Sequence, residues 1–120
     1  MKFPKRGDIW LVNLDPAIGS EIKKTHPAVI LSNDINNEYA DTVTVIPVTS
    51  ASEKIYPFET LLLVGEGGLK QNSKAKANQI RTVDKKRLVR LIGSLPESKI
   101  SELEYAVAVH LDMKGEEIKR

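Results

Sequence analysis

The apolar residues in the first two thirds of the chain fall into short runs separated by turn-forming residues. Each run is rich in β-branched side chains, a composition that is typical of β-strands. The first four predicted strands span residues 9–12, 27–31, 42–48 and 59–63, and three more span residues 74–77, 79–83 and 89–92. In the third run Val43, Val45 and Pro47 alternate with Thr42 and Thr44, and only the end of the run is apolar on both faces. We therefore expect that end to be buried more deeply than its start.

The apolar period changes near the C-terminus. Ile100, Leu103, Val107, His110 and Leu111 recur on one face of a helical repeat, so residues 96–113 are predicted to form one amphipathic helix. A glycine at position 115 is expected to end the helix, which leaves residues 114–120 as a frayed polar tail. Several short strands followed by a single helix favour a mainly β fold: a small, strongly curved, SH3-like barrel with the helix packed against it.

The segments between these runs carry turn and capping residues. Residues 15–26 have no sustained period and contain proline, glycine and several ionisable side chains, so a long loop is predicted there. Residues 32–37 are expected to hold at most one helical turn. The glycine-rich residues 65–68 predict a tight turn. Asp84 can cap a short helical turn over residues 85–88.

Length and composition limit the classes of protein to which the chain can belong. The 120 residues are predicted to form one domain, residues 1–120. Cysteine is absent, which excludes disulfides, thiolate metal sites and cysteine nucleophiles. Only two histidines are present, so no metal site and no cofactor are predicted. A core of this size would gain from burying further apolar surface in a dimer.

Charge and hydropathy give the expected location but not the partner. A net charge of +2 is too small to indicate a nucleic-acid partner by itself. The charged residues at the start of the chain are followed by no apolar stretch as long as a signal peptide, and no run of about 18 apolar residues occurs. These features predict a cytoplasmic protein that makes no contact with a membrane.

Polar residues gather at two places where strands are expected to begin or end. They are Ser20, Glu21, Lys24 and His26 on or beside the long loop, and Thr49 and Ser50 after the central strand. Side chains that directly follow a buried strand are held rigidly enough to face a ligand, so these groups are expected to flank a groove. Gln79 and Arg81 add an amide and a guanidinium that suit phosphate groups or base edges. The chain has no phosphate-binding glycine loop, zinc-ligand spacing or nucleophile elbow.

Five stretches of the chain occur in a characteristic order. They are Arg6-Gly7-Asp8-Ile9-Trp10, Gly19-Ser20-Glu21-Ile22 with His26-Pro27 after it, residues 27–33, Pro47-Val48-Thr49-Ser50, and residues 79–88. Each stretch alone is weak, but together, over about residues 5–113, the chain resembles the MazF/PemK toxin family. The resemblance implies a CcdB/PemK-type barrel and the toxin of a toxin–antitoxin system.

The resemblance also implies an activity and partners. Members of the family are endoribonucleases, called mRNA interferases, that cut single-stranded RNA without a metal ion. The 2′-hydroxyl attacks the adjacent phosphorus and leaves a 2′,3′-cyclic phosphate and a 5′-hydroxyl end. Such a reaction needs a group that accepts the 2′ proton, a group that protonates the 5′ oxygen, and donors to the phosphorane oxygens. The implied partners are a second copy of the chain, with RNA along the homodimer interface, and a MazE-type antitoxin whose tails occupy the same grooves.

One position departs from the family pattern. In the family, an arginine before the proline of the second strand and a threonine or serine after the third strand carry catalysis. Thr49 matches the latter position, but His26 occupies the arginine position. Three interpretations of His26 stay open. An imidazole can act as base or acid at neutral pH, the loss of a permanent cation can leave an attenuated toxin, or the histidine is a deliberate substitution that disables a toxin harmful to its host.

The resemblance assigns further residues to the site. Glu21 is a third catalytic candidate, because it could accept the 2′ proton or orient His26, although it could also simply shape the loop. Lys76 stands near the position of a catalytic arginine in other members, so it could supply the missing charge or be an exposed strand lysine. Contacts with RNA are predicted for Ser20, Lys24, Ser50, Lys76, Gln79 and Arg81.

A non-catalytic alternative uses the same barrel. It is either a CcdB-like toxin that inhibits gyrase or an RNA-binding homologue that lost its chemistry with the arginine, and fold alone does not separate these functions. The sequence does not indicate which RNA sequence is cut or which antitoxin binds, because recognition of unpaired bases depends on loop conformation.

Overall fold

The structure is a computed structural model that describes residues 3–51 and 54–114. Within these residues the chain forms seven strands, two α-helices and three short 3-10 helices. In chain order they are β1 (Asp8–Asn13), β2 (Thr25–Ile30), α1 (Asp34–Tyr39), β3 (Thr42–Ser50), β4 (Glu59–Leu62), η1 (Glu66–Gly68), β5 (Ser73–Lys76), η2 (Ala77–Gln79), β6 (Arg81–Asp84), η3 (Lys85–Arg87), β7 (Leu88–Ser94) and α2 (Glu97–Leu111). The mainly β fold with a C-terminal helix is therefore confirmed.

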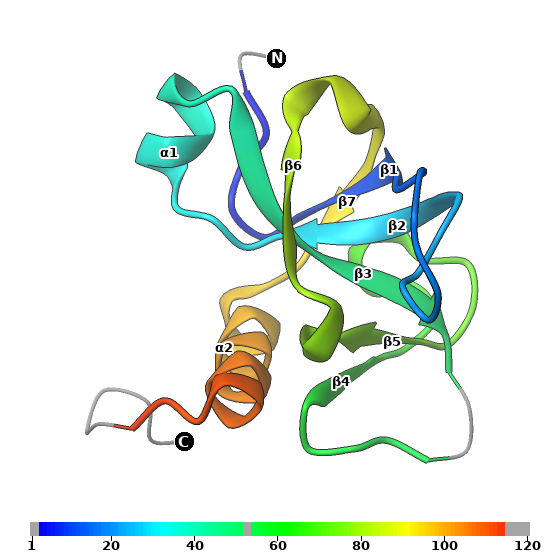
Figure 1. The fold of residues 1–120 in the computed structure, drawn as a ribbon. Helices are drawn as coiled ribbons and strands as arrows, with labels where there is room; N and C mark the ends of the chain where they lie inside the picture. Colours follow the sequence, from blue (N-terminus) through cyan, green and yellow to red (C-terminus); the bar gives the residue numbers. More distant parts are fainter. Residues whose placement is uncertain (1–2, 52–53, 115–120) are drawn as a thin grey trace.

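Strand β3 organises the sheet because it pairs along both of its edges. One edge pairs with β2, with Ala28 opposite Pro47. The other edge pairs with β6 along its first half and with β5 along Val48–Ser50. All pairs are antiparallel, and the strand order is β4-β5-β3-β2-β1-β7 with β6 beside the start of β3. In Figure 1 β3 crosses the middle of the molecule, and the other strands curve around it.

Successive residues of β3 supply two separate core clusters, because neighbouring side chains in a strand point to opposite faces of the sheet. Ile46 and Val48 join the cluster that α2 covers with residues such as Leu103. Val43 and Val45 join a second cluster on the opposite face. Residues 45–48 are all buried, so the predicted deeper burial of the end of this strand is confirmed.

The predicted C-terminal helix is confirmed over Glu97–Leu111. Its first turns pack against the core, whereas His110 and Leu111 are exposed, so the predicted apolar face is wrong for the last turn. The helix ends at Asp112, whose backbone lies in the left-handed region with a φ of 56°. Gly115, the predicted stop, lies outside the described residues together with the rest of the predicted tail.

Two smaller elements differ from the prediction for local reasons. Helix α1 is longer than the single turn expected, because the Asn33 side chain caps it and the buried Asn37 amide donates to the Ser32 carbonyl. Gln79 was expected in a strand but lies in η2, where Ile80 N–H bonds back to the Ala77 carbonyl. Strand β6 consequently starts only at Arg81.

Strands β4 and β5 are joined by a buried ionic cluster as well as by their backbone ladder. Glu59 on β4 has a fully buried side chain, and its two carboxylate oxygens lie 3.2 Å from Lys74 Nζ and 2.9 Å from Lys76 Nζ on β5. The Tyr56 amide donates to the same carboxylate at 3.0 Å. We call Glu59, Lys74 and Lys76 the β4–β5 ionic cluster.

The surroundings of Glu59 lower the pKa of its carboxyl below the ordinary value of 4.5. Burial acts in the opposite direction and raises the pKa, but the hydrogen bonds from the Tyr56 amide, Lys76 and Lys74 together outweigh it. Because the folded state lowers this pKa, the ionised carboxylate stabilises the fold above the pKa of the unfolded chain. That stabilisation is lost as the pH falls through the lower pKa of the folded state.

The first prediction concerns acid stability. Glu59→Gln should lower the free energy of unfolding at pH 7. Its difference from the unmodified protein should shrink as the pH falls below about 4.5, because the unfolded chain then takes up the proton first, and the native carboxylate is neutralised only at its lower pKa. Urea unfolding followed by circular dichroism from pH 3 to pH 7, at one protein concentration, measures this difference. A difference that stays constant over that range would contradict the assignment of a charged, stabilising Glu59.

Candidate active site

The strand register places His26 beside Thr49. Ala28 on β2 lies opposite Pro47 on β3, so the same antiparallel register continued by two residues brings His26 opposite Thr49. A side-chain contact supports this position, because His26 Nδ1 lies 3.2 Å from the Val48 carbonyl oxygen. The two leading catalytic candidates thus come from neighbouring strands and share one face of the sheet.

The contact with Val48 determines how a neutral His26 carries its proton. A carbonyl oxygen can only accept, so Nδ1 must be the protonated nitrogen that donates to it. In a neutral imidazole the other nitrogen, Nε2, then has a free lone pair and can accept a proton. His26 is half-buried, and the Val48 carbonyl holds its ring.

Thr49 and Ser50 follow the buried part of β3, as the sequence suggested. Thr49 is half-buried, whereas Ser50 is exposed and its hydroxyl accepts a hydrogen bond of 2.8 Å from Gln71 Nε2. Along β5, Lys74 lies directly opposite Thr49. Lys76 lies two residues farther along β5 on the same face. The interpretation of Lys76 as an exposed strand lysine does not hold, because the residue is half-buried and paired with Glu59.

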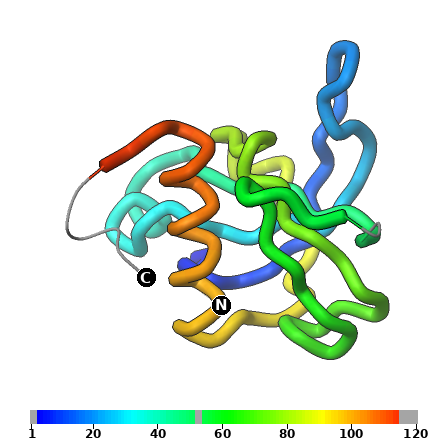
Figure 2. The backbone as a smooth tube through the Cα atoms, turned by 90° about the horizontal axis from the view of Figure 1, so that it is seen from below, coloured from blue at the N-terminus to red at the C-terminus, as the bar shows by residue number. Residues whose placement is uncertain are grey.

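The long loop between β1 and β2 is tied to the site by Gln79. The Gln79 side chain accepts from the Ile22 amide at 3.2 Å and donates to the Ser20 carbonyl at 3.5 Å. This loop, drawn in blue in Figure 2, projects from the body of the molecule. The contacts of Gln79 therefore tie Ser20 and Ile22, in the middle of this loop, to η2.

The other loop residues have local roles in the described structure. The Glu21 carboxylate accepts from the Ile18 amide at 2.8 Å, and among the described residues it makes no hydrogen bond with His26. Lys24 is exposed and adopts a positive φ of 67°, and its amide donates to Asp15. These contacts close the loop on itself and leave the Lys24 side chain toward solvent.

Arg81 lies farther from the catalytic candidates than the other predicted residues. It is half-buried on β6 opposite Val45, which precedes Thr49 by four residues on β3. The structure thus brings His26, Thr49, Lys76 and the loop residue Ser20 with its partner Gln79 around one end of β3, while Arg81 lies opposite the middle of that strand.

Two charged residues of this region, Glu59 and Lys74, were not among the candidate site residues predicted from the sequence. Both lie on short strands, where the sequence pattern indicates exposed charged residues. Only the pairing of β4 with β5 brings them together. A usable indication was the alternation of Lys74 and Lys76 with alanines, because it places both lysines on one face of a strand whose other face is apolar.

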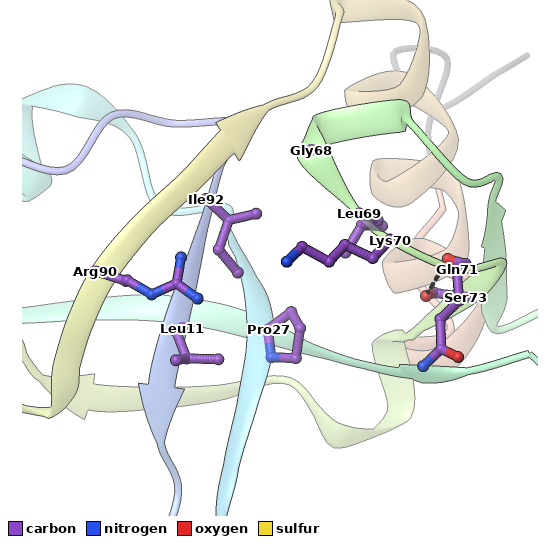
Figure 3. A pocket seen from close by; sticks show the side chains of 9 residues that line it. All are labelled: Leu11, Pro27, Gly68, Leu69, Lys70, Gln71, Ser73, Arg90 and Ile92. Atoms are coloured by element: carbon purple, nitrogen blue, oxygen red, sulfur yellow. Dashed lines mark hydrogen bonds between the residues drawn. The ribbon is translucent and has the colours of Figure 1, made fainter.

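An open pocket of about 420 Å³ lies on the opposite face of β1 and β2. Leu11 and Pro27, which are cross-strand partners, form its floor, and Lys70 and Arg90 point into it from two sides (Figure 3). Since successive strand residues alternate, Pro27 faces away from the side on which its neighbour His26 lies. This pocket therefore lies on the other face of the sheet from His26 and Thr49, and Ser50 adjoins it through its bond to Gln71 and its pairing with Ser73.

Within residues 3–51 and 54–114, no group of three or more histidine, cysteine, aspartate or glutamate side chains lies close enough to hold a metal ion. Neither helix in this part of the chain has the length and apolar character needed to cross a membrane.

Comparisons with known proteins gave matches over most of the chain. The chain matches, over residues 5–111, the model of a family described as PemK-like, MazF-like toxins of type II toxin-antitoxin systems. It is 44% identical over 114 residues to the endoribonuclease MazF9 of Mycobacterium tuberculosis, covering 91% of this chain and 97% of the relative. A crystal structure of MazF from Deinococcus radiodurans matches with a TM-score of 0.81 at 26% identity, covering 92% and 98% of the two chains. A MazE–MazF structure from the same organism matches with a TM-score of 0.72 at 26% identity, covering 92% and 97%.

The matched family region contains every candidate site residue, from Ser20 to Arg81. The structural match to MazF supports the predicted CcdB/PemK-type fold. Because the family model covers nearly the whole chain and a relative is 44% identical over 91% of it, this chain belongs to the family of PemK-like, MazF-like toxins of type II toxin–antitoxin systems.

Proposed function

We propose that this protein is a metal-independent endoribonuclease toxin that cleaves single-stranded RNA and is neutralised by a MazE-type antitoxin. The observation that carries the proposal is the His26 ring, anchored by the Val48 carbonyl beside Thr49. A relative at 44% identity is named an endoribonuclease, which supports the same reaction class. The RNA sequence that is cut and the identity of the antitoxin lie outside this proposal.

In the proposed reaction, His26 is the base. Its Nε2 accepts the proton of the 2′-hydroxyl while the 2′ oxygen forms a bond to the adjacent phosphorus. The bond between phosphorus and the 5′ oxygen breaks, the departing oxygen takes a proton from solvent, and His26 then releases its own proton to solvent. The products are a 2′,3′-cyclic phosphate and a 5′-hydroxyl end, and no water is consumed. The Thr49 hydroxyl donates to a phosphorane oxygen as negative charge develops there.

The surrounding residues bind the RNA in this proposal. Lys76 offers a cation on the same face as Thr49, and Ser50 borders it along β3. Gln79 holds the loop that contains Ser20, Glu21 and Lys24, so RNA would pass between this loop and the end of β3. The contact of Glu21 with the Ile18 amide favours a loop-shaping role over direct orientation of His26. Arg81 would contact RNA only at some distance from the cut bond.

The partners follow from the family. A MazE–MazF structure matches this chain, so we propose that a MazE-type antitoxin binds this toxin in the cytoplasm. We also propose a homodimer, because exposed apolar side chains such as Leu61, Leu63 and Val64 cluster on and after β4, where a second copy could cover them.

The second prediction tests the reaction. In excess EDTA, the unmodified protein should cut a long unstructured RNA, and Thr49→Ala should lower kcat on the order of 100-fold because it removes one donor to the phosphorane. The new ends are mapped by primer extension and tested for 5′-hydroxyl and cyclic phosphate. Thr49→Ser is the matched control, since it keeps the hydroxyl. Loss of cleavage in EDTA alone would instead indicate a metal-dependent reaction.

The third prediction tests the role of His26. His26→Gln keeps an N–H that can donate to the Val48 carbonyl but has no nitrogen that accepts a proton, so cleavage should fall by about 100-fold or more. His26→Arg restores the family residue and serves as the comparison. Cleavage by His26→Gln at the unmodified rate would refute a base at this position, and cleavage by His26→Arg alone would show a disabled toxin. Gyrase inhibition without RNA cleavage by any variant would favour the CcdB-like alternative.

A further inference from the structure

The β4–β5 ionic cluster lies on the same face of the sheet as the proposed catalytic groups. Lys74 is the cross-strand partner of Thr49, and Glu59 is the cross-strand partner of Lys76. Paired residues in antiparallel strands place their side chains on one face. One row across the sheet therefore holds His26, Thr49 and Lys74, and the next row holds Lys76 and Glu59.

The two lysines of the cluster differ in their surroundings. The Lys74 side chain is 10% exposed, and its ammonium bonds both to Glu59 and to the Lys54 carbonyl at 3.4 Å. The Lys76 side chain is 23% exposed, and among the described residues Glu59 is the one carboxylate within ion-pair distance. The Lys74 ammonium is thus held inside the protein by two partners, whereas the Lys76 ammonium contacts Glu59 and is exposed enough to contact a ligand as well.

Glu59 is itself held in a fixed position. Its side chain is completely buried, and it accepts from the Tyr56 amide while its own amide donates to the Tyr56 carbonyl at 2.8 Å. A lysine on a flexible four-carbon stem is a poorly aimed point charge unless a neighbour restrains it. The carboxylate of Glu59 provides that restraint for Lys76, at 2.9 Å.

We propose that Glu59 is a positioning residue that aims the Lys76 ammonium at the phosphate held by His26 and Thr49. This inference rests on the proposed function. It explains how a site with histidine in place of the family arginine keeps a permanent cation beside the reacting phosphate. A restrained cation stabilises the developing charge without having to reorganise during the reaction, which is the condition for effective electrostatic catalysis. Lys74 has the structural role of sharing the buried carboxylate.

The matched pair Lys76→Met and Lys74→Met separates the two lysine roles, because both residues lie on β5 and bond to the same carboxylate. Lys76→Met should lower kcat at least about 10-fold. Its melting temperature should be closer to that of the unmodified protein than the melting temperature of Lys74→Met is. The salt dependence of RNA binding should also become less steep by about one contact. Lys74→Met should lower the melting temperature more than Lys76→Met does, and the kcat of the folded variant should stay within about 3-fold of that of the unmodified protein. Equal kcat losses in the two variants would overturn the assignment.

Glu59→Gln tests the positioning itself. Binding is measured with an RNA that carries 2′-deoxyribose at the mapped cleavage position, so that it cannot be cut. Removing a carboxylate near a phosphate should leave binding unchanged or stronger, whereas loss of the restraint on Lys76 should lower kcat at least about 10-fold. A general structural defect would weaken binding and cleavage together and would count against positioning, as would an unchanged kcat.

The outcomes separate this inference from the proposed function. If the unmodified protein cuts RNA, Thr49→Ala does not, and Glu59→Gln cuts normally, only the positioning role fails. If the unmodified protein does not cut RNA, the proposed function fails and the inference falls with it. Should Glu59→Gln not fold, the comparison of Lys76→Met with Lys74→Met decides the question, because both variants keep Glu59 paired with one lysine.

Discussion

The arrangement of the candidate site depends on the double pairing of β3. Antiparallel ladders fix the register of a strand, and a shift by one residue would move every side chain to the other face of the sheet. Because β3 is paired with β2 on one edge and with β6 and β5 on the other, its register is constrained from both sides. Thr49 therefore has fixed neighbours, His26 on β2 and Lys74 on β5.

The same ladder that builds the cores also ends at the site. Val45 and Ile46 are completely buried on opposite faces of β3, so the strand cannot slide without exposing one cluster. Where the ladder between β2 and β3 ends, the Val48 carbonyl is available and binds the His26 ring. The hydrophobic cores thus supply the rigidity, and the first unpaired backbone group beyond them sets the orientation of the proposed base.

Electrostatics around the site follow from burial. A buried carboxylate is costly unless cations and amide donors surround it, and Glu59 has Lys74, Lys76 and the Tyr56 amide as partners. The contacts that offset the cost of burying the Glu59 carboxylate also restrain the two lysines. A cluster that stabilises the joint between β4 and β5 thereby also fixes positive charge on the face that carries Thr49.

Elements with strong local patterns, and the residues that belong to family motifs, were predictable from the amino-acid sequence alone. Alternating β-branched residues predicted β3, helical spacing predicted α2, and the family-like stretches pointed to His26 and Thr49 as candidate catalytic residues. Local rules were less successful at element ends. Gln79 entered a 3-10 turn, and the last turn of α2 exposed His110, because hydrogen bonds and contacts outside the window of a sequence pattern decide where an element ends.

Which of the charged residues contact one another depends on how the strands pair in the folded chain. Glu59 and Lys76 are 17 residues apart in the chain, and no sequence period links them. Their contact comes from the register of β4 on β5, which is set by the packing of both strands. The hydrogen bond of His26 to the Val48 carbonyl is likewise invisible in the sequence, since every residue carries a carbonyl and only the end of a ladder leaves one available. Sequence patterns thus specified the strands, and the pairing of those strands specified the chemistry between them.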